Sequence, residues 1–168
     1  MNKGLLISEG TLKKYTLIND NVDGKYLLTA IQAAQDIDLT DLIGPELVGK
    51  LEELVCSDEI AQPENKAYKT LLDDYITPYL CWQVMASIQI AVNYKMTNSG
   101  IIQNDDTNRS HLDYRSQQAL IDQYNRYSNS YARKLKTFLD KNVAAYKEYR
   151  CHTAYIQDVP TYGIYLEN

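Results

Sequence analysis

The chain has 168 residues, of which 45% are hydrophobic and 23% are charged, and its formal net charge is −5. This size suits one domain with a real hydrophobic core, and the composition is that of a soluble globular protein rather than a disordered or fibrous one. The most apolar stretch, residues 79–92, is interrupted by Gln83, Ser87 and Gln89. It falls short of the ~20 apolar residues that a membrane-spanning helix needs, and the N-terminus lacks the apolar run of a signal peptide.

The first predicted element is a short helix over the sequence EGTLKKY. Ser8 precedes it and can accept a hydrogen bond from a backbone N–H group of the first turn. Residues 5–7 before this cap are expected to be extended.

The next element begins with a sequence that resembles a calcium loop. Asn19, Asn21 and Asp23 stand at alternate positions and Gly24 follows, as in an EF-hand. The twelfth loop position is Ala30, however, where calcium needs a bidentate glutamate. We therefore expect no metal site, and interpret Asp23 as the cap of a helix over residues 24–34. The apolar face of this helix would consist of Leu27, Leu28, Ile31 and Ala34.

The sequence DIDLTDLIGPEL is predicted to interrupt that helix. Asp41 would cap the short turn that follows, and Pro45 suits the first position of the next helix, over residues 46–55. Residues 56–65 are predicted to form a polar loop, and Pro63 near its end to start another helix.

The central helix is predicted from apolar residues at helical spacing on both sides of Pro78. This proline removes one backbone hydrogen bond and clashes with the preceding turn, which predicts a kink. The sequence YLCWQVMASIQIAVNYKM beyond it is apolar on most sides, as expected for the centre of a bundle. An exposed loop built on Gly100 should follow. The apolar face before and around the kink consists of Tyr68, Leu71, Leu72, Tyr75, Ile76, Tyr79 and Leu80, and the core residues beyond it are Trp82, Val84, Met85, Ile88 and Val92.

The longest predicted helix starts at a capping box formed by Ser110 and Asp113 and runs to about Tyr149. Such a helix of ~40 residues would be about 60 Å long, so part of its apolar stripe should face something outside the monomer. The chain has 15 Tyr but only 1 Phe and 1 Trp. Tyrosine suits surfaces that are wet in a monomer and buried in an assembly, although compositional drift explains the count equally well. The stripe consists of Leu120, Tyr124, Tyr127, Tyr131, Leu135, Phe138, Leu139, Val143, Tyr146 and Tyr149.

Charge is unevenly distributed along the chain. Residues 109–150 carry 9 basic and 4 acidic side chains, whereas residues 1–108 carry 8 basic and 16 acidic ones. The basic residues are mixed with Tyr and Asp, so a nucleic-acid site, head-to-tail packing of identical subunits and a plain solvated helix all remain open. The candidate subunit-interface residues are Tyr124, Tyr127, Tyr131, Arg126 and Arg133.

The chain divides into a helical domain, residues 1–150, and a C-terminal arm, residues 151–168. Pro160 and Gly163 break helix in this arm, and its β-branched and aromatic residues favour an extended chain. So much apolar surface is expected either to lie across its own subunit or to add to another chain, a partner or a neighbouring subunit. The candidate contact residues are Tyr155, Ile156, Val159, Tyr162, Ile164, Tyr165 and Leu166. The fold class is thus all-α: a small bundle with a kinked central helix, one long helix and an extended tail.

No motif for catalysis or for a cofactor is found. The three cysteines, Cys56, Cys81 and Cys151, form no CxxC pair, so neither a zinc site nor a disulfide framework is predicted. Cys151 precedes His152, but adjacent side chains point in different directions, and His111 is the only other histidine. Asp73–Asp74 and Asp105–Asp106 are adjacent only in sequence. We expect no enzyme, no cofactor and no catalytic residue.

The order of these elements resembles the head–tail connector proteins of tailed bacteriophages, particularly those of phages that infect Bacteroides-type hosts, including the crAss-like group. The resemblance covers residues 5 to about 102. It rests on a first helix ending near "AQ", the turn "LIGPEL", the helix "YITPYL" and the turn "TNSGI". These motifs are structural, so they bear on fold more directly than on role.

The resemblance implies a structural virion protein in the neck between capsid and tail. Copies would form a ring, typically of twelve, that docks on the portal protein, contacts adjacent neck or tail proteins, and continues the DNA channel without sequence-specific binding. Such a ring would assemble in the host cytoplasm without a membrane. The alternatives are another neck adaptor or terminator ring protein, a small cytoplasmic helical binding protein, and an enzyme using Cys151 and His152.

Overall fold

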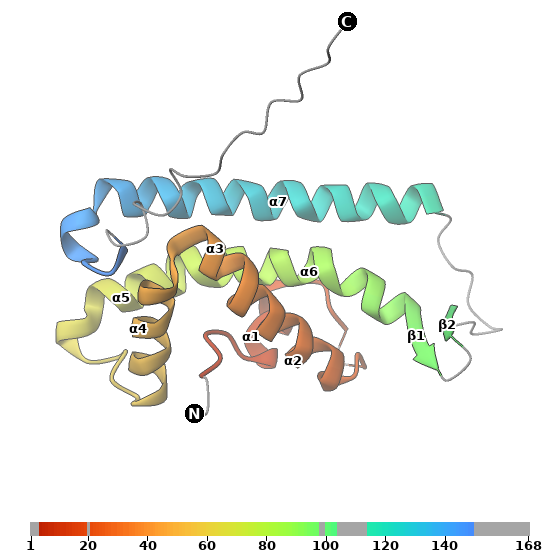
Figure 1. The fold of residues 1–168 in the computed structure, drawn as a ribbon, viewed down its shortest axis with the longest axis horizontal. Coiled ribbons are helices and arrows are strands. Elements are labelled where there is room, and N and C mark those ends of the chain that lie inside the picture. The colour runs from red at the N-terminus through yellow and green to blue at the C-terminus, as the bar shows by residue number, and fades with distance from the viewer. Residues whose placement is uncertain (1–3, 20, 98–99, 104–113, 150–168) are drawn as a thin grey trace, which may run out of the picture.

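The computed structural model describes residues 4–19, 21–97, 100–103 and 114–149. It confirms the predicted all-α fold, a helical bundle with a kinked central helix and one long helix lying along it (Figure 1). The predicted arm, residues 151–168, lies outside the described residues. In chain order the elements are α1 (Glu9–Tyr15), α2 (Gly24–Ala33), the π-helical η1 (Ala34–Leu39), α3 (Thr40–Ile43), α4 (Pro45–Cys56), the 3₁₀ turn η2 (Pro63–Asn65), α5 (Lys66–Leu71), the π-helical η3 (Leu72–Ile76), α6 (Thr77–Asn93), β1 (Tyr94–Thr97), β2 (Gly100–Gln103), α7 (Tyr114–Lys141) and the 3₁₀ turn η4 (Val143–Ala145).

The helix starts predicted from local signals are confirmed. The Ser8 hydroxyl accepts a hydrogen bond from the Thr11 N–H at 3.0 Å, and the Asp23 carboxylate accepts one from the Lys25 N–H at 2.9 Å. Pro45 occupies the first turn of α4, where its missing N–H costs nothing.

The predicted interruption after Ala34 is wrong. The chain stays helical from α2 through η1 and α3, and Asp41 lies inside this helix instead of capping a new turn. The helix ends only at Gly44, whose φ of 93° is readily adopted by glycine alone. A wider π-helical turn in η1 absorbs the polar sequence that suggested a break.

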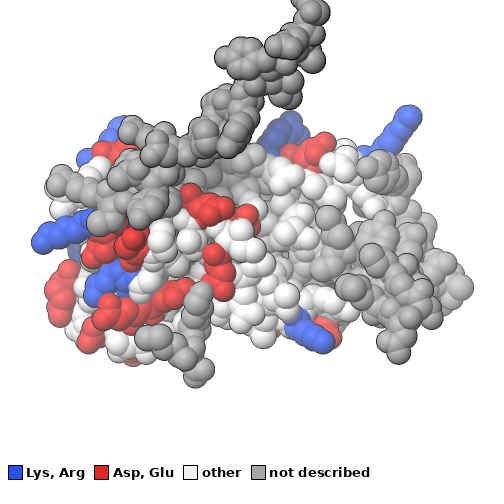
Figure 2. All heavy atoms as spheres, in the orientation of Figure 1, with Lys and Arg blue, Asp and Glu red and all other residues white. Residues whose placement is uncertain are grey.

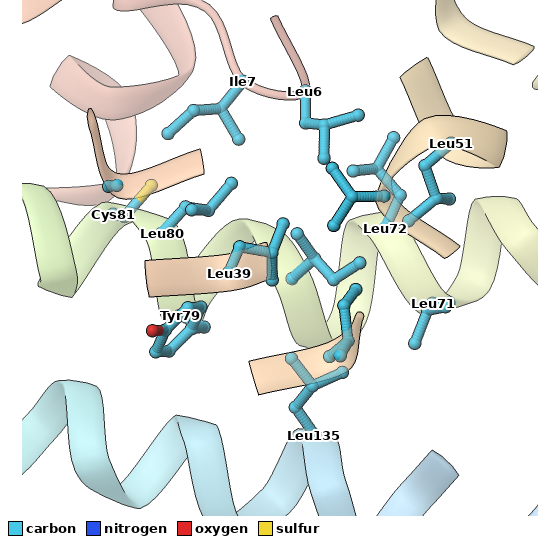
Figure 3. Close-up of a cluster of buried hydrophobic side chains, with 14 of the residues drawn as sticks. Leu6, Ile7, Leu39, Leu51, Leu71, Leu72, Tyr79, Leu80, Cys81 and Leu135 are labelled. Carbon is cyan, nitrogen blue, oxygen red and sulfur yellow. The ribbon is translucent and has the colours of Figure 1, made fainter. Parts of the chain in front are cut away.

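The core lies between α6 and the elements packed around it. Leu27 and Ile31 of α2 are fully buried, whereas Leu28 is 41% exposed and does not belong to the apolar face predicted for it. Figure 3 shows side chains from the N-terminal segment, η1, α4 and α6 meeting in one cluster. Val84, Met85 and Ile88 are buried as predicted, and Trp82 is half-buried.

Gln35 is a buried polar side chain that ties the N-terminal segment to the bundle. Its Oε1 accepts a hydrogen bond from the Leu6 N–H at 2.8 Å. Its Nε2 donates to the Gly4 carbonyl at 3.0 Å and to Glu52 Oε1 at 2.8 Å. One amide group therefore satisfies backbone groups that no helix or sheet supplies with partners. Leu6, held in this way, is buried in the core.

The kink in the central helix coincides with the π-helical turn η3. This turn directly precedes Thr77 and Pro78, the first residues of α6. Because proline crowds the carbonyl of the preceding turn and donates no hydrogen bond, a wider turn at this point accommodates the ring within a continuous helical segment. No helix in the described ranges is both long and apolar enough to cross a membrane.

A short hairpin replaces the exposed loop expected around Gly100. The central helix ends at Asn93, and β1 pairs antiparallel with β2, with Tyr94 opposite Gln103 and Thr97 opposite Gly100. The sequence did not predict the pairing of two strands, because Asn, Ser and Gly residues indicate only that the chain reverses.

Helix α7 runs antiparallel to α6 along most of its length (Figure 1). Polar and aromatic contacts join the two helices. Ser128 Oγ donates to Gln83 Oε1 at 2.6 Å, and Phe138 stacks on Tyr75 of η3 with ring centroids 4.0 Å apart. The capping box predicted at Ser110 and Asp113 lies outside the described residues.

The long helix ends earlier than predicted. It stops at Lys141 after 28 residues, instead of reaching Tyr149. The Asn142 side-chain amide donates to the Phe138 carbonyl at 2.8 Å, which competes with continuation of the helix. The chain then turns back, and the Tyr146 hydroxyl donates to the Ala67 carbonyl at 2.9 Å. Tyr146 thus joins the returning chain to α5, and both Tyr146 and Tyr149 are buried.

Adjacent leucines of α2 test this core. Leu27→Ala should lower the free energy of unfolding by about 2–5 kcal/mol, because it leaves a cavity at a fully buried position. Leu28→Ala, the same substitution at the exposed neighbour, should cost less than about 1 kcal/mol. Chemical denaturation of both variants would measure the difference, and equal losses would contradict the orientation of α2.

The Gln35 contacts can be tested by an isosteric change. Gln35→Glu replaces a donor with an acceptor beside the Gly4 carbonyl and Glu52, and should destabilise the protein by about 1–3 kcal/mol. Gln32→Glu, the same change at an exposed position of α2, is the control and should be nearly neutral. A Gln35→Glu protein as stable as the parent would show that the N-terminal segment is not held by this side chain.

Candidate subunit interface

The outer side of α7 is basic. Its buried stripe packs against the bundle, which leaves the remaining surface of the helix to solvent. From the middle of the helix onward, Lys and Arg recur at short intervals on the side of α7 that faces away from the bundle. The exposed basic residues are Arg126, Arg133, Lys134, Lys136 and Lys141.

The opposite charge gathers on another part of the same bundle. Figure 2 shows Asp and Glu side chains over the end of the molecule formed by α3, α4 and α5. One of them, Glu53, is paired with Lys50 at 3.0 Å. Between η1 and η2 the exposed or half-exposed acidic residues outnumber the one lysine; they are Asp36, Asp38, Asp41, Glu46, Glu52, Glu53, Asp58, Glu59 and Glu64. The subunit therefore presents a basic and an acidic surface, an arrangement that suits a head-to-tail contact between identical copies.

The five candidate residues on α7 have different environments. Tyr124 is only 8% exposed and packs on Trp82 at a ring-centroid distance of 5.8 Å, so it stabilises its own subunit. Tyr127 is 39% exposed and meets the Trp82 ring edge-on at 4.9 Å. Tyr131 is half-buried, with Lys134 Nζ 4.8 Å from its ring centroid. Arg126 and Arg133 are exposed.

A shallow depression lies beside the basic half of α7. The stacked rings of Tyr75 and Phe138 form its apolar wall, and Arg133, Lys134 and Lys141 are its charged lining residues. Its volume is about 640 Å³. Cationic groups beside aromatic surface suit an acidic partner segment better than a neutral one.

Tyr149 of the stripe and Tyr68 of α5 make hydrogen bonds inside the subunit. Burial is the main cause that raises the pKa of Tyr149 to about 12, and its hydrogen bond to Asp140 at 2.8 Å is the second cause. The pKa of Tyr68 is raised to about 12 in the same way, mainly by burial and secondly by the hydrogen bond to Glu148 at 2.9 Å. These hydroxyls are donors to carboxylates, so they tie the returning chain to α5 and α7.

The described residues show no arrangement suited to catalysis. Cys81 is buried, and desolvation raises the pKa of its thiol to about 12, which disfavours the reactive thiolate. Cys56 is exposed. Asp73 pairs with Lys69 at 2.7 Å. Among the described residues, no three His, Cys, Asp or Glu side chains converge as metal ligands.

Part of the predicted chemistry lies outside the described residues. This applies to His111, Cys151, His152, Asp105–Asp106 and the arm residues Tyr155, Ile156, Val159, Tyr162, Ile164, Tyr165 and Leu166. Conversely, sequence reasoning missed Gln35 and the position of Asp38 and Tyr79 in the lining of one pocket. A signal for Gln35 existed, since an amide interrupts the otherwise apolar face of a helix.

Comparison with known proteins places the chain in one family. Residues 39–158 match the model described as "Family of unknown function (DUF6712)", so the chain belongs to this family. No curated protein sequence and no solved structure shows significant similarity to it. The match begins in η1 and includes the whole of α7.

The raised tyrosine pKa values predict alkaline instability. A phenol whose folded pKa lies near 12 stabilises the folded state fully below the unfolded pKa of ~10, and this contribution is lost as the pH rises toward 12. Tyr149→Phe should lower stability at neutral pH, because it deletes the hydrogen bond to Asp140, and should flatten the decline above pH ~10. Urea denaturation of the parent and of Tyr149→Phe at several pH values would measure how the stability of each declines with pH. Parallel declines would contradict the raised pKa of Tyr149.

Proposed function

We propose that this chain is a structural virion protein of the neck of a tailed bacteriophage, a head–tail connector. Copies form a ring that docks on the portal protein and joins the capsid to the tail. The ring continues the DNA channel, and the protein acts by assembly without turnover.

The observation that carries this proposal is the separation of charge on one bundle. The outer side of α7 is a basic surface, and the segment from η1 to η2 contributes an acidic one. Contacts between these unlike faces are heterologous, and heterologous contacts close into rings when the rotation between copies permits. In a two-fold dimer, by contrast, a single patch containing both surfaces would have to pair with itself.

Three features of the subunit agree with this role. An extensive core cluster draws on helices from both ends of the bundle, as a stable building block requires. The net charge of −5 suits a channel through which DNA slides without tight binding. The arm residues 151–168, which lie outside the described residues, would provide a contact to the portal or to a neighbouring subunit.

The proposal predicts ring formation that depends on salt. Mixed with a portal protein from the same phage, the full chain should form rings visible by electron microscopy. Association should weaken at least tenfold between about 0.1 and 1 M salt, because the Debye length falls from about 10 Å to about 3 Å. Light scattering would follow the change in mass.

Two outcomes would contradict this prediction. A chain that remains a monomer or dimer and never attaches to the portal would favour a helical binding protein instead. Rings that are indifferent to salt would show that the charged faces do not form the contact.

A further inference from the structure

A small polar pocket lies between the π-helical segment η1, helix α3 and the middle of α7. Its volume is about 320 Å³. The polar lining comes from three separate parts of the chain: Asp38, Asp41, Tyr79, Gln83, Ser128 and Asn129. None of its described lining residues is basic, and Asp38 contributes a carboxylate to the lining.

Tyr79 indicates that this pocket is built to receive a group. Its side chain is only 5% exposed, and its ring lies at the edge of the core cluster with the hydroxyl directed away from the centre (Figure 3). Within the described part of the chain, this hydroxyl makes no hydrogen bond. No fully buried polar side-chain atom there lacks a partner, so the Tyr79 oxygen must open into the pocket. A buried phenol is normally hydrogen-bonded, and this one has a place for a partner.

The charges around the hydroxyl define the partner. Burial first, and then the nearby carboxylates of Asp38 and Asp41, raise the pKa of Tyr79, so the phenol stays neutral beside negative charge. The complementary ligand is a cation with several N–H donors. A guanidinium group, whose donors form a planar fork, suits a carboxylate and a phenol oxygen better than a spherical ion does.

We propose that this pocket receives an arginine side chain of a second copy of the chain. This inference rests on the proposed function and names a contact within the ring. Arg126 is the arginine we assign, because its side chain is exposed on the outer side of α7. Arg133, by comparison, already donates to Ser130 Oγ at 3.3 Å in its own subunit.

The neighbouring surface would complete the contact. A second hollow of about 270 Å³ shares Leu42, Asn129 and Ala132 with the pocket and adds Arg133 and Lys136. The groove between α3 and α7 thus has an apolar floor, an acidic half and a basic half. A segment that carries an arginine and a nearby acidic residue would find opposite charges at both positions, as α7 itself offers with Arg126 and Asp122.

Charge reversal tests the assignment. Asp38→Lys and Arg126→Glu should each weaken self-association of the full chain at low salt by tenfold or more. An equal mixture of the two variants should assemble again, because each copy then meets a complementary partner on both sides. Asp74→Lys, the same change at an exposed position in η3, is the matched control and should assemble normally. Analytical ultracentrifugation measures the association, and circular dichroism verifies that each variant is folded.

The outcomes separate this inference from the proposed function. If the parent forms rings but Asp38→Lys assembles equally well, or the mixture stays dissociated, the arginine contact is overturned and the connector proposal survives. If the parent never assembles, even with the portal, the proposed function fails. Titration of the monomer with N-ethylguanidinium, followed by the NMR signals of the Tyr79 ring, then decides the pocket. Saturable shifts that disappear in Asp38→Asn support it; no shift, or a response to calcium alone, overturns it.

Discussion

The burial of α6 is the constraint on which the other elements depend. This helix is apolar on most sides, and a helix of that kind is stable in water only when neighbours cover it all round. Helices α1, α2 and α7 and the π-helical η1 and η3 all pack against it, and the N-terminal segment adds Leu6 and Ile7. The polar link between Ser128 and Gln83 fixes how α7 lies on α6, since a buried hydroxyl and amide must meet to avoid a loss of hydrogen bonding.

Sequence reasoning succeeded where the determining interactions are local. Ser8, Asp23 and Pro45 act within one turn of their own helix, and each helix begins where these residues predict. It failed where distant residues decide. The segment after Ala34 stays helical because η1 and α3 are held between α6 and α7, and the end of α7 depends on Tyr146 reaching Ala67. The hairpin at Gly100 depends on cross-strand pairing, which the turn residues alone do not specify.

The candidate site was predictable in its chemistry but not in its geometry. The basic surplus of α7 and the exposure of Arg126 and Arg133 follow from residue types and helical spacing. The tyrosine stripe predicted the exposed surface only in part. Tyr124 and Tyr149 make their contacts within the subunit, and Tyr127 is the exposed tyrosine of the stripe in the described chain. The pocket at Tyr79 needed the structure, because Asp38 and Ser128 become neighbours only after α3 and α7 have packed on α6.

The π-helical turns give the bundle an unusual tolerance to changes in chain length. Removing a residue from an ordinary α-helix rotates everything beyond it by roughly 100° and turns buried side chains toward water. A π turn already contains one residue more than an α turn. Loss of an exposed residue such as Ile37 from η1 would convert that turn to an α turn while the flanking segments keep their faces. Related chains can therefore differ by single-residue insertions at these two places and still share one core.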